Sequence, residues 1–234
     1  MKKVLVIMMV LLAVTASAVF AKQGFTLRGG FSYDFINSKI PGEVGILAKD
    51  AYWRAHAFGA EFGVTYNFSD SFLVYGDTTI GFYNTFKVGD HEAKKDEGEK
   101  ALYLGTANHV GAAYDFDFDS ALDLQVGGGL AMEFARVTET EKIDDYTNNT
   151  DTIGILSFGF GLYANVGYSL SDRVSITATL HPDFMIVSSI VVQDTTTTTF
   201  ADSKAVYEDT GTWMLFDAAF SFKFNASVGV TFKF

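Results

Sequence analysis

The sequence predicts an all-β fold: a closed, antiparallel, up-and-down transmembrane β-barrel of eight strands. Three features of the sequence predict it. Apolar and polar residues alternate over long stretches, the segments between these stretches are alternately short and long, and the polar face of the alternation is made mostly of small residues. Strict alternation has the side-chain period of a β-strand with one apolar and one polar face.

The composition fits a single β domain and excludes several kinds of site. The 234 residues include 23 Phe and 22 Gly, but only two Pro and no Cys. Without cysteine there are no disulfides and no thiolate metal ligands. The formal net charge is −11, without basic clusters. This argues against nucleic-acid binding, because phosphate contacts need Lys and Arg.

The first 21 residues have the pattern of a secretory signal peptide. Lys2 and Lys3 precede an apolar run over residues 4–14, and small residues follow. Cleavage after Ala21 is favoured, with Ala18 as the alternative. We therefore expect a signal peptide at residues 1–21 and one barrel domain at residues 22–234. Beyond the leader no apolar run reaches the roughly 18 residues of a membrane helix, so any bilayer crossing must use strands.

The strand signal is clearest at the C-terminus. Every even position from Met214 to Phe234 is apolar, and most odd positions are polar or small. In the seventh of the eight predicted strands, Pro182 removes a ladder hydrogen bond and predicts a bulge or the rim of the membrane. The same alternation predicts the seven upstream strands at residues 25–35, 58–68, 72–82, 102–116, 122–134, 156–170 and 174–186.

A repeated segment fixes the order of the connections. Residues 64–72 match residues 166–174, and residues 112–120 form a looser copy. Each copy ends one strand, turns at Ser and Asp, and starts the next strand. The repeat therefore predicts short turns near Ser69, Asp119 and Asp172, and long polar loops at residues 36–55, 87–100, 137–152 and 193–212. In the last loop the run Thr195 to Thr199 favours extended structure, with hairpins that continue the seventh and eighth strands above the membrane.

The polar face decides which side of the barrel meets lipid. A soluble eight-stranded barrel would show the same period with its apolar face inside, but its outer face would be rich in Lys and Glu. Here the polar face is mostly Gly, Ser, Thr, Ala and Asn, which suits a narrow lumen. The large apolar side chains are therefore predicted to face lipid. Tyr66, Tyr114 and Tyr168, beside the short turns, are predicted to form an interfacial aromatic girdle.

Together these features resemble the small outer-membrane β-barrels of bacteria, such as the transmembrane domain of outer membrane protein A and the opacity-type adhesins. The terminal residues Val228, Val230, Phe232 and Phe234 resemble the C-terminal signal that the assembly machinery of such barrels reads. The resemblance implies a location in the bacterial outer membrane. It also implies three partners: the lipid bilayer, the barrel assembly machinery and periplasmic chaperones. Since it is a likeness of architecture, it implies no particular activity.

Charged and hydrogen-bonding residues are predicted on the lumen face. Buried charges are tolerated when they are paired, so we expect ion pairs that fill the interior, with Arg28 near Asp77 or Glu61. The alternative is a gated polar path in which the histidines add pH sensitivity near neutrality. The predicted lumen network comprises Arg28, Glu61, Asp77, His109, Asp123, Tyr163, His181 and Lys223, and Glu133 and Asp183 are predicted to face the same side.

The sequence predicts no catalytic, cofactor or metal site. His109 and His181 point inward, while His56 and His91 lie in or beside loops without a Ser–acid partner. No HExxH or nucleophile-elbow pattern occurs, and the acidic loops lack EF-hand spacing. We therefore expect a structural or surface-interaction protein of the adhesion type, whose long loops meet a host surface. The alternative is a narrow, porin-like channel for a small or hydrophobic solute ligand.

Overall fold

The computed structural model describes residues 24–40, 51–88, 91–92, 100–118, 121–143, 147–200, 203–209 and 213–234. The predicted signal peptide, residues 1–21, lies outside the described residues and stays a prediction. Within the described part of the chain, no helix is long and apolar enough to span a membrane. The strands are β1 (Phe25–Ile40), β2 (Ala51–Asn67), β3 (Phe72–Val88), β4 (His91–Glu92), β5 (Lys100–Asp117), β6 (Leu122–Lys142), β7 (Thr147–Ser171), β8 (Val174–Phe200), β9 (Ser203–Asp209) and β10 (Trp213–Lys233).

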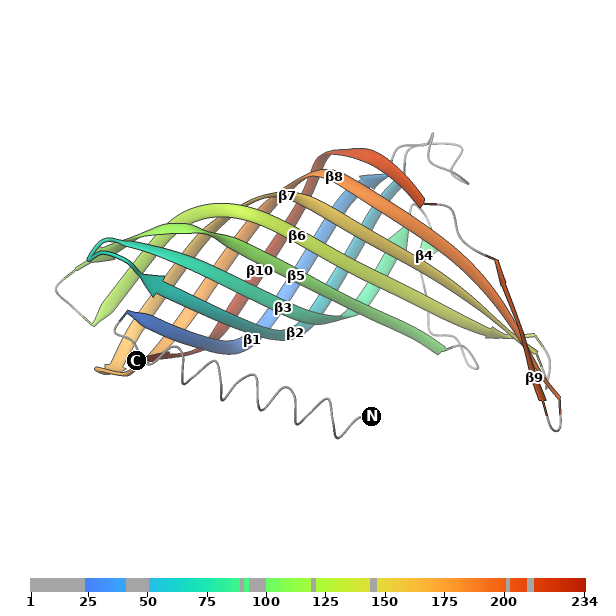
Figure 1. The fold of residues 1–234 in the computed structure, drawn as a ribbon, viewed down its shortest axis with the longest axis horizontal. Coiled ribbons are helices and arrows are strands. Elements are labelled where there is room, and N and C mark those ends of the chain that lie inside the picture. Colours follow the sequence, from blue (N-terminus) through green and yellow to red (C-terminus); the bar gives the residue numbers. More distant parts are fainter. Residues whose placement is uncertain are drawn as a thin grey trace.

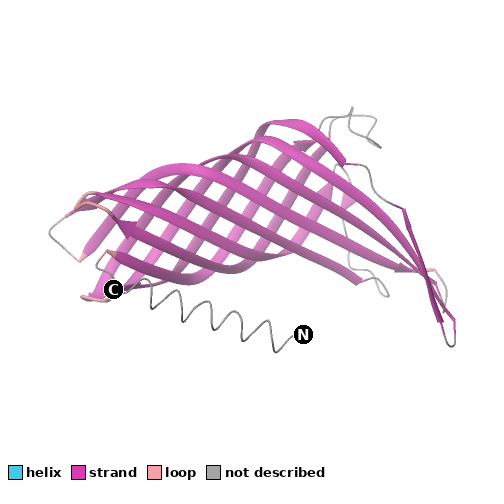
Figure 2. Ribbon diagram, in the orientation of Figure 1, coloured by secondary structure: helices cyan, strands magenta, loops and turns pink. Residues whose placement is uncertain are grey.

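Eight of these strands form a closed antiparallel barrel, and the predicted fold class is confirmed. Their order is β10-β1-β2-β3-β5-β6-β7-β8, and β10 pairs back onto β8. Each barrel strand therefore has a hydrogen-bonded neighbour on both sides, which lipid requires because it offers backbone groups no water. Figures 1 and 2 show the tilted strands wrapping around one lumen. β4 and β9 are short additions that pair with β3 and β8.

The short turns lie at one end of the barrel, next to the C-terminus (Figure 1). Ser69 lies in the turn between β2 and β3, and Asp172 lies in the turn between β7 and β8, as predicted. The predicted turn residue Asp119 lies outside the described residues. This end is called the short-turn end below, and the opposite end is called the long-strand end.

The long-strand end departs from the prediction of four long loops. β6 continues to Lys142 and β7 begins at Thr147, so most of the predicted loop at residues 137–152 is strand. β8 continues to Phe200 and pairs with β9, so the predicted loop at residues 193–212 is largely a hairpin. The prediction for residues 137–152 was wrong because it took polar composition as a sign of irregular backbone, while the extended structure predicted at Thr195 to Thr199 is confirmed. β-branched Thr favours extended backbone, and antiparallel strands can stay paired in water.

Beyond the closed barrel the described strands separate into two sheets. β1 stops pairing with β10 after Asn37 and Phe222, and β3 stops pairing with β5 after Phe82 and Leu104. Past these points β1 to β4 form one sheet, which takes up part of the predicted loops at 36–55 and 87–100. β5 to β10 form the other sheet, which carries the long extension of β6 to β9 (Figure 1).

Pro182 lies within β8, where the sequence predicted a bulge or the membrane rim. β7 and β8 pair in the same register on both sides of Pro182. The two pairs in between, Leu162 with Pro182 and Tyr163 with His181, are missing from the ladder. Proline has no N–H to donate, so it interrupts the ladder without adding a residue. The nearest register shift lies between Phe158 and Gly159.

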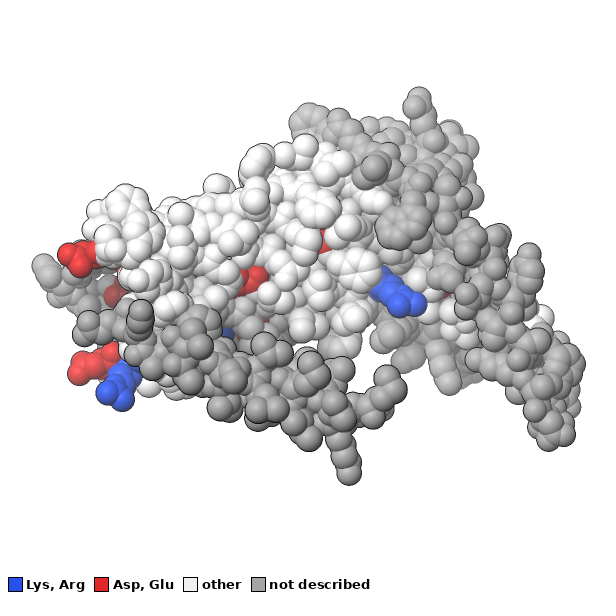
Figure 3. Space-filling view, viewed as in Figure 1, with Lys and Arg blue, Asp and Glu red and all other residues white. Residues whose placement is uncertain are grey.

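The alternation places large apolar side chains outside and polar side chains inside. Phe31 is 85% exposed, and Phe58, Leu130, Phe160 and Val228 are about 60% exposed on the same outer wall. In Figure 3 the wall between the two ends carries few charged atoms. An apolar surface of this extent needs an apolar surrounding. The soluble barrel, with its apolar face inside, is therefore excluded.

Glycine lets neighbouring strands approach closely on the lumen side. A Cβ built on Gly127 would overlap the carbonyl oxygen of Ala112 and lie 2.5 Å from the Cα of Ala113. A Cβ built on Gly29 would have no heavy atom within 4 Å. The two positions therefore differ in the space they offer a side chain, although both lie within strands.

We expect Gly127→Val to lower the free energy of unfolding by about 1–3 kcal/mol, because the new side chain must displace the backbone of β5. Urea unfolding of the protein refolded in detergent, followed by gel mobility without boiling, measures the change. Gly29→Val is the matched control and should unfold like the parent protein. An equal loss in both variants would contradict the close approach at Gly127.

The outer wall gives a second prediction. Leu130→Arg should lower the free energy of unfolding in lipid vesicles by about 2–4 kcal/mol, since Leu130 lies far from both ends of the apolar wall. Phe118→Arg, next to the short turns, should cost about 0–1 kcal/mol, because a charge there reaches the interface. Equal costs at the two exposed positions would contradict the assignment of the bilayer to this wall.

Candidate functional site: the polar network of the lumen

Arg28 on β1 is the centre of the lumen network. Its Nη2 lies 2.5 Å from Asp77 Oδ1 on β3, and its Nε donates to Glu61 Oε1 on β2 at 3.1 Å. Its Nη1 donates to the Tyr163 hydroxyl at 3.2 Å and to Asn165 Oδ1 at 3.3 Å, both on β7. The planar fork of guanidinium donors thus lets one side chain connect four strands.

Two histidines stack beside this group. The rings of His109 on β5 and His181 on β8 have centroids 4.0 Å apart and an interplanar angle of 9°. His109 Nε2 lies 2.8 Å from Asp183 Oδ2, and His181 Nε2 lies 3.1 Å from Asp77 Oδ2. Asp77 therefore uses one oxygen for Arg28 and the other for His181.

Two stacked tyrosines lie next to Arg28. The rings of Tyr75 and Tyr163 have centroids 4.1 Å apart and an interplanar angle of 15°. The Tyr163 hydroxyl donates to Gln125 Oε1 at 3.0 Å, and Asn165 Nδ2 donates to the same oxygen at 3.2 Å. The sequence analysis did not select Tyr75, Gln125 or Asn165. All three residues have odd numbers, like Asp77 and Tyr163 in the same or neighbouring strands. Since odd positions in these strands face the lumen, the alternation in the sequence was enough to identify them.

A second layer of ion pairs lies toward the long-strand end. Lys223 Nζ on β10 is 3.6 Å from Asp34 Oδ1 on β1 and 3.6 Å from Glu133 Oε1 on β6. Asn225 Nδ2 donates to Asp34 Oδ1 at 2.7 Å. Asp34 and Asn225 were also missed by the sequence analysis, although both alternate with apolar residues in their strands.

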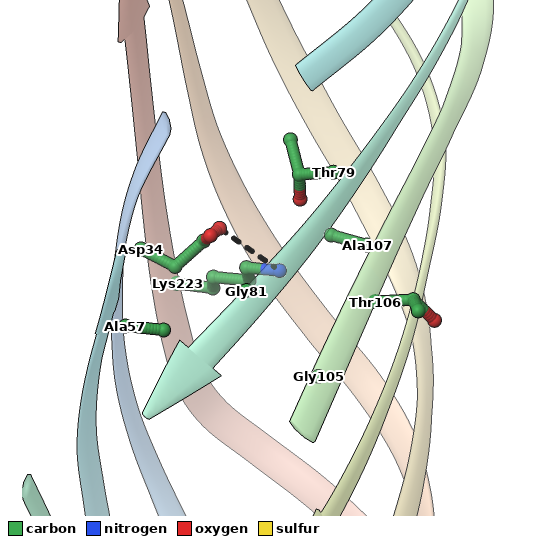
Figure 4. A pocket seen from close by; sticks show the side chains of 8 residues that line it. All are labelled: Asp34, Ala57, Thr79, Gly81, Gly105, Thr106, Ala107 and Lys223. Atoms are coloured by element: carbon green, nitrogen blue, oxygen red, sulfur yellow. Dashed lines mark ion pairs between the residues drawn. The ribbon is translucent and has the colours of Figure 1, made fainter. Parts of the chain in front are cut away.

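Figure 4 shows the residues around a narrow space beside this second layer, which is too small to hold a water molecule. The ion pair between Lys223 and Asp34 lies across it, so two opposite charges occupy the space through which a solute would pass. The narrow space is lined by Asp34, Ala57, Thr79, Gly81, Gly105, Thr106, Ala107 and Lys223.

Asp123 lies apart from both layers. Its Oδ2 is 3.1 Å from Lys233 Nζ, and the two side chains are 33% and 40% exposed. The sequence analysis placed Asp123 in the lumen network, but it is the second residue of β6 and lies next to the short turns. Asp123 therefore forms a separate ion pair at the barrel end.

The other predicted residues lie on the outer wall. His56 Nδ1 is 2.6 Å from the Tyr33 hydroxyl. This partner is a tyrosine and differs from the Ser and acid that bond to the histidine of a catalytic triad. The predicted girdle residues Tyr66, Tyr114 and Tyr168 and the predicted assembly residues Val228, Val230, Phe232 and Phe234 are all exposed on this wall. Their positions suit contact with lipid, while their roles in anchoring and assembly stay predictions.

Several solved structures share this fold. Neisserial surface protein A is 16% identical, with a TM-score of 0.51 over 91% of this chain and 98% of that chain. A major outer membrane protein from Thermus thermophilus is 13% identical, with a TM-score of 0.55 over 88% and 99%. The outer membrane protein OprG from Pseudomonas aeruginosa is 14% identical, with a TM-score of 0.54 over 91% and 97%. No protein-family model and no curated protein matches the sequence.

At these identities the likeness concerns the fold. The fold is that of small outer-membrane barrels, and the apolar wall is the surface that such a location requires. The chain is therefore an eight-stranded transmembrane β-barrel of the bacterial outer membrane.

Loss of Arg28 should destabilise the barrel strongly. Arg28→Ala leaves the carboxylates of Glu61 and Asp77 buried without their cation, and we expect a loss of about 3–5 kcal/mol in the free energy of unfolding. Lys233→Ala is the matched control, because its ion pair with Asp123 is exposed and contributes about 0–1 kcal/mol. Urea unfolding of both variants in detergent measures the difference. A loss below about 1 kcal/mol for Arg28→Ala would contradict a structural role for the network.

Proposed function

We propose that the protein is a structural and surface-interaction barrel whose β6–β9 extension binds a partner outside the cell. The observation that carries this proposal is the extension itself. β6, β7 and β8 continue past the closed barrel as a hydrogen-bonded sheet and end in the β8–β9 hairpin. A paired sheet holds its side chains in more fixed positions than an irregular loop does, which favours recognition.

The charge of the extension favours a basic partner. Residues 137–152 and 193–212 contain nine Asp and Glu but only two Lys. Complementary charge speeds the encounter between partners and selects among them. The edge of the sheet adds a second means of contact. Among the described strands β9 pairs with β8 alone, so its other edge offers backbone groups to an extended segment of a partner.

The lumen supports a structural role over transport. Arg28 connects β1, β2, β3 and β7, while Lys223 connects β1, β6 and β10. Charged pairs therefore cross the interior at two levels. A connected polar network of this kind makes an interior rigid, and it leaves the barrel as a fixed support for the extension.

Removal of the hairpin tip tests the surface-interaction function. The change replaces residues 196–207 with Asn-Gly, which closes a two-residue turn on the paired residues Thr195 and Glu208. We expect a folded barrel, checked by heat-modifiable gel mobility, and a loss of at least about tenfold in adherence to polylysine surfaces and epithelial cell layers. A matched control replaces Thr196 and Thr198 with Ser, which keeps the length and the charge of the hairpin, and should adhere like the parent protein. Unchanged adherence after removal of the tip would contradict the proposal.

The second candidate function is a narrow channel for a small or hydrophobic solute, whose path would run past the narrow space beside Lys223. Planar-bilayer recording distinguishes the two functions. We expect the parent protein to give no discrete conductance steps, because ion pairs cross the lumen at both levels. Reproducible steps that change in size with Glu61→Gln, but stay unchanged with Lys233→Ala, would favour the channel and count against a purely structural lumen.

A further inference from the structure

The buried lumen contains more negative than positive groups. Among the described residues its permanent cations are Arg28 and Lys223. Its buried carboxylates are Asp34, Glu61, Asp77, Glu133 and Asp183. Buried charges of one sign without counter-charge are costly. The lumen must therefore bind additional positive charge, either as protons or as a cation.

Part of this excess lies around Arg28. Its guanidinium pairs with the two carboxylates of Glu61 and Asp77, and Asp77 bonds in turn to His181. With neutral histidines these groups have a net charge of −1. Lys223 lies in the other layer, where it faces Asp34 and Glu133 at 3.6 Å, so its charge is already opposed by two carboxylates.

Three side chains of this group have the geometry of a metal site. Glu61, Asp77 and His181 each offer one ligand atom, and these three atoms lie within 4.8 Å of one another. All three side chains are buried, and they come from β2, β3 and β8. Arg28 bonds to Glu61 Oε1 and Asp77 Oδ1, so Glu61 Oε2 and Asp77 Oδ2 are not used by the guanidinium.

An independent observation points to a ligand in this place. Glu61 Oε2 is a buried carboxylate oxygen without a hydrogen-bond partner in the described structure. Buried polar atoms nearly always have a partner. Asp77 Oδ2 lies 3.1 Å from His181 Nε2.

We propose that Glu61, Asp77 and His181 bind a divalent transition-metal ion of the Zn²⁺ class inside the barrel. One imidazole and two carboxylates form a ligand set that Zn²⁺ accepts, with water as a fourth ligand. The histidine nitrogen favours such an ion over Ca²⁺ and Mg²⁺, which select oxygen ligands. A charge of +2 reduces the excess of three negative charges among the buried lumen residues to one.

One of the distances between the ligand atoms is already close to the spacing around a bound ion. Bonds of about 2.0–2.2 Å at tetrahedral angles place neighbouring ligand atoms about 3.4 Å apart. The 3.1 Å between His181 Nε2 and Asp77 Oδ2 is close to this spacing. The ion would take the place of the hydrogen bond between these two atoms, and Glu61 Oε2 would complete the set.

Zinc retention tests the proposal. The parent protein and the variants Glu61→Gln, His181→Gln and His109→Gln are refolded in detergent with ZnCl₂, passed over a desalting column in millimolar Ca²⁺ and analysed for metal. His109→Gln is the matched control, because His109 is buried and bonded to an aspartate like His181 but lies outside the three-residue set. Folding of each variant is checked by gel mobility with and without boiling.

We expect the parent protein and His109→Gln to retain about one zinc per chain and to need a higher temperature for unfolding after zinc loading. Glu61→Gln and His181→Gln should bind zinc about 100-fold more weakly and show no thermal shift. Cobalt absorption of the parent protein provides a readout that needs no variant, since tetrahedral coordination gives an intense visible band. No zinc retention by the parent protein would overturn the proposal and assign the missing positive charge to protons. Equal zinc retention by all four proteins would also overturn it and assign the metal to the acidic extension.

Discussion

Closure of the sheet in lipid is the constraint on which the rest of this structure depends. Lipid offers backbone N–H and C=O groups no partner, so the strands must pair on both sides. Eight strands close around a lumen just wide enough for side chains. The inward charges therefore cannot reach water and have to meet one another. Arg28 bonds to Asp77 and Glu61 on neighbouring strands and to Tyr163 across the lumen.

The two ends of the barrel differ because this constraint stops at the membrane surface. Past Asn37 and Phe222, and past Phe82 and Leu104, closure ends, and in the described part of the chain two sheets continue with edges that pair with no further strand. Free edges invite pairing with other chains in water. The longer sheet combines such an edge with a strongly acidic sequence. Both features favour a surface partner, and both lie beyond the part of the barrel that lipid requires to be closed.

The sequence predicted the barrel because alternation and side-chain size are local signals. It also placed Arg28, Glu61 and Asp77 on the lumen face, since parity along a strand determines the face. It could not give the contacts across the lumen, because the meeting of Arg28 with Tyr163 depends on how far each strand is shifted along its neighbours. Tyr75 was missed, although its odd position, two residues before Asp77, places it on the lumen face. The extension at residues 137–152 was missed because polar strands and polar loops have similar compositions.

The interrupted ladder at Pro182 connects the lumen network to the barrel wall. The backbone pairs between β7 and β8 are missing at residues 162–163 and 181–182, and Tyr163 and His181 point inward from this gap. Their rings lie 5.3 Å apart, and both are hydrogen-bonded to the group around Arg28. Side chains thus hold the two strands together where the backbone does not. If the network moved aside to open a passage, the contact between β7 and β8 would also loosen. This favours a lumen with a structural role, which supports the extension at the long-strand end.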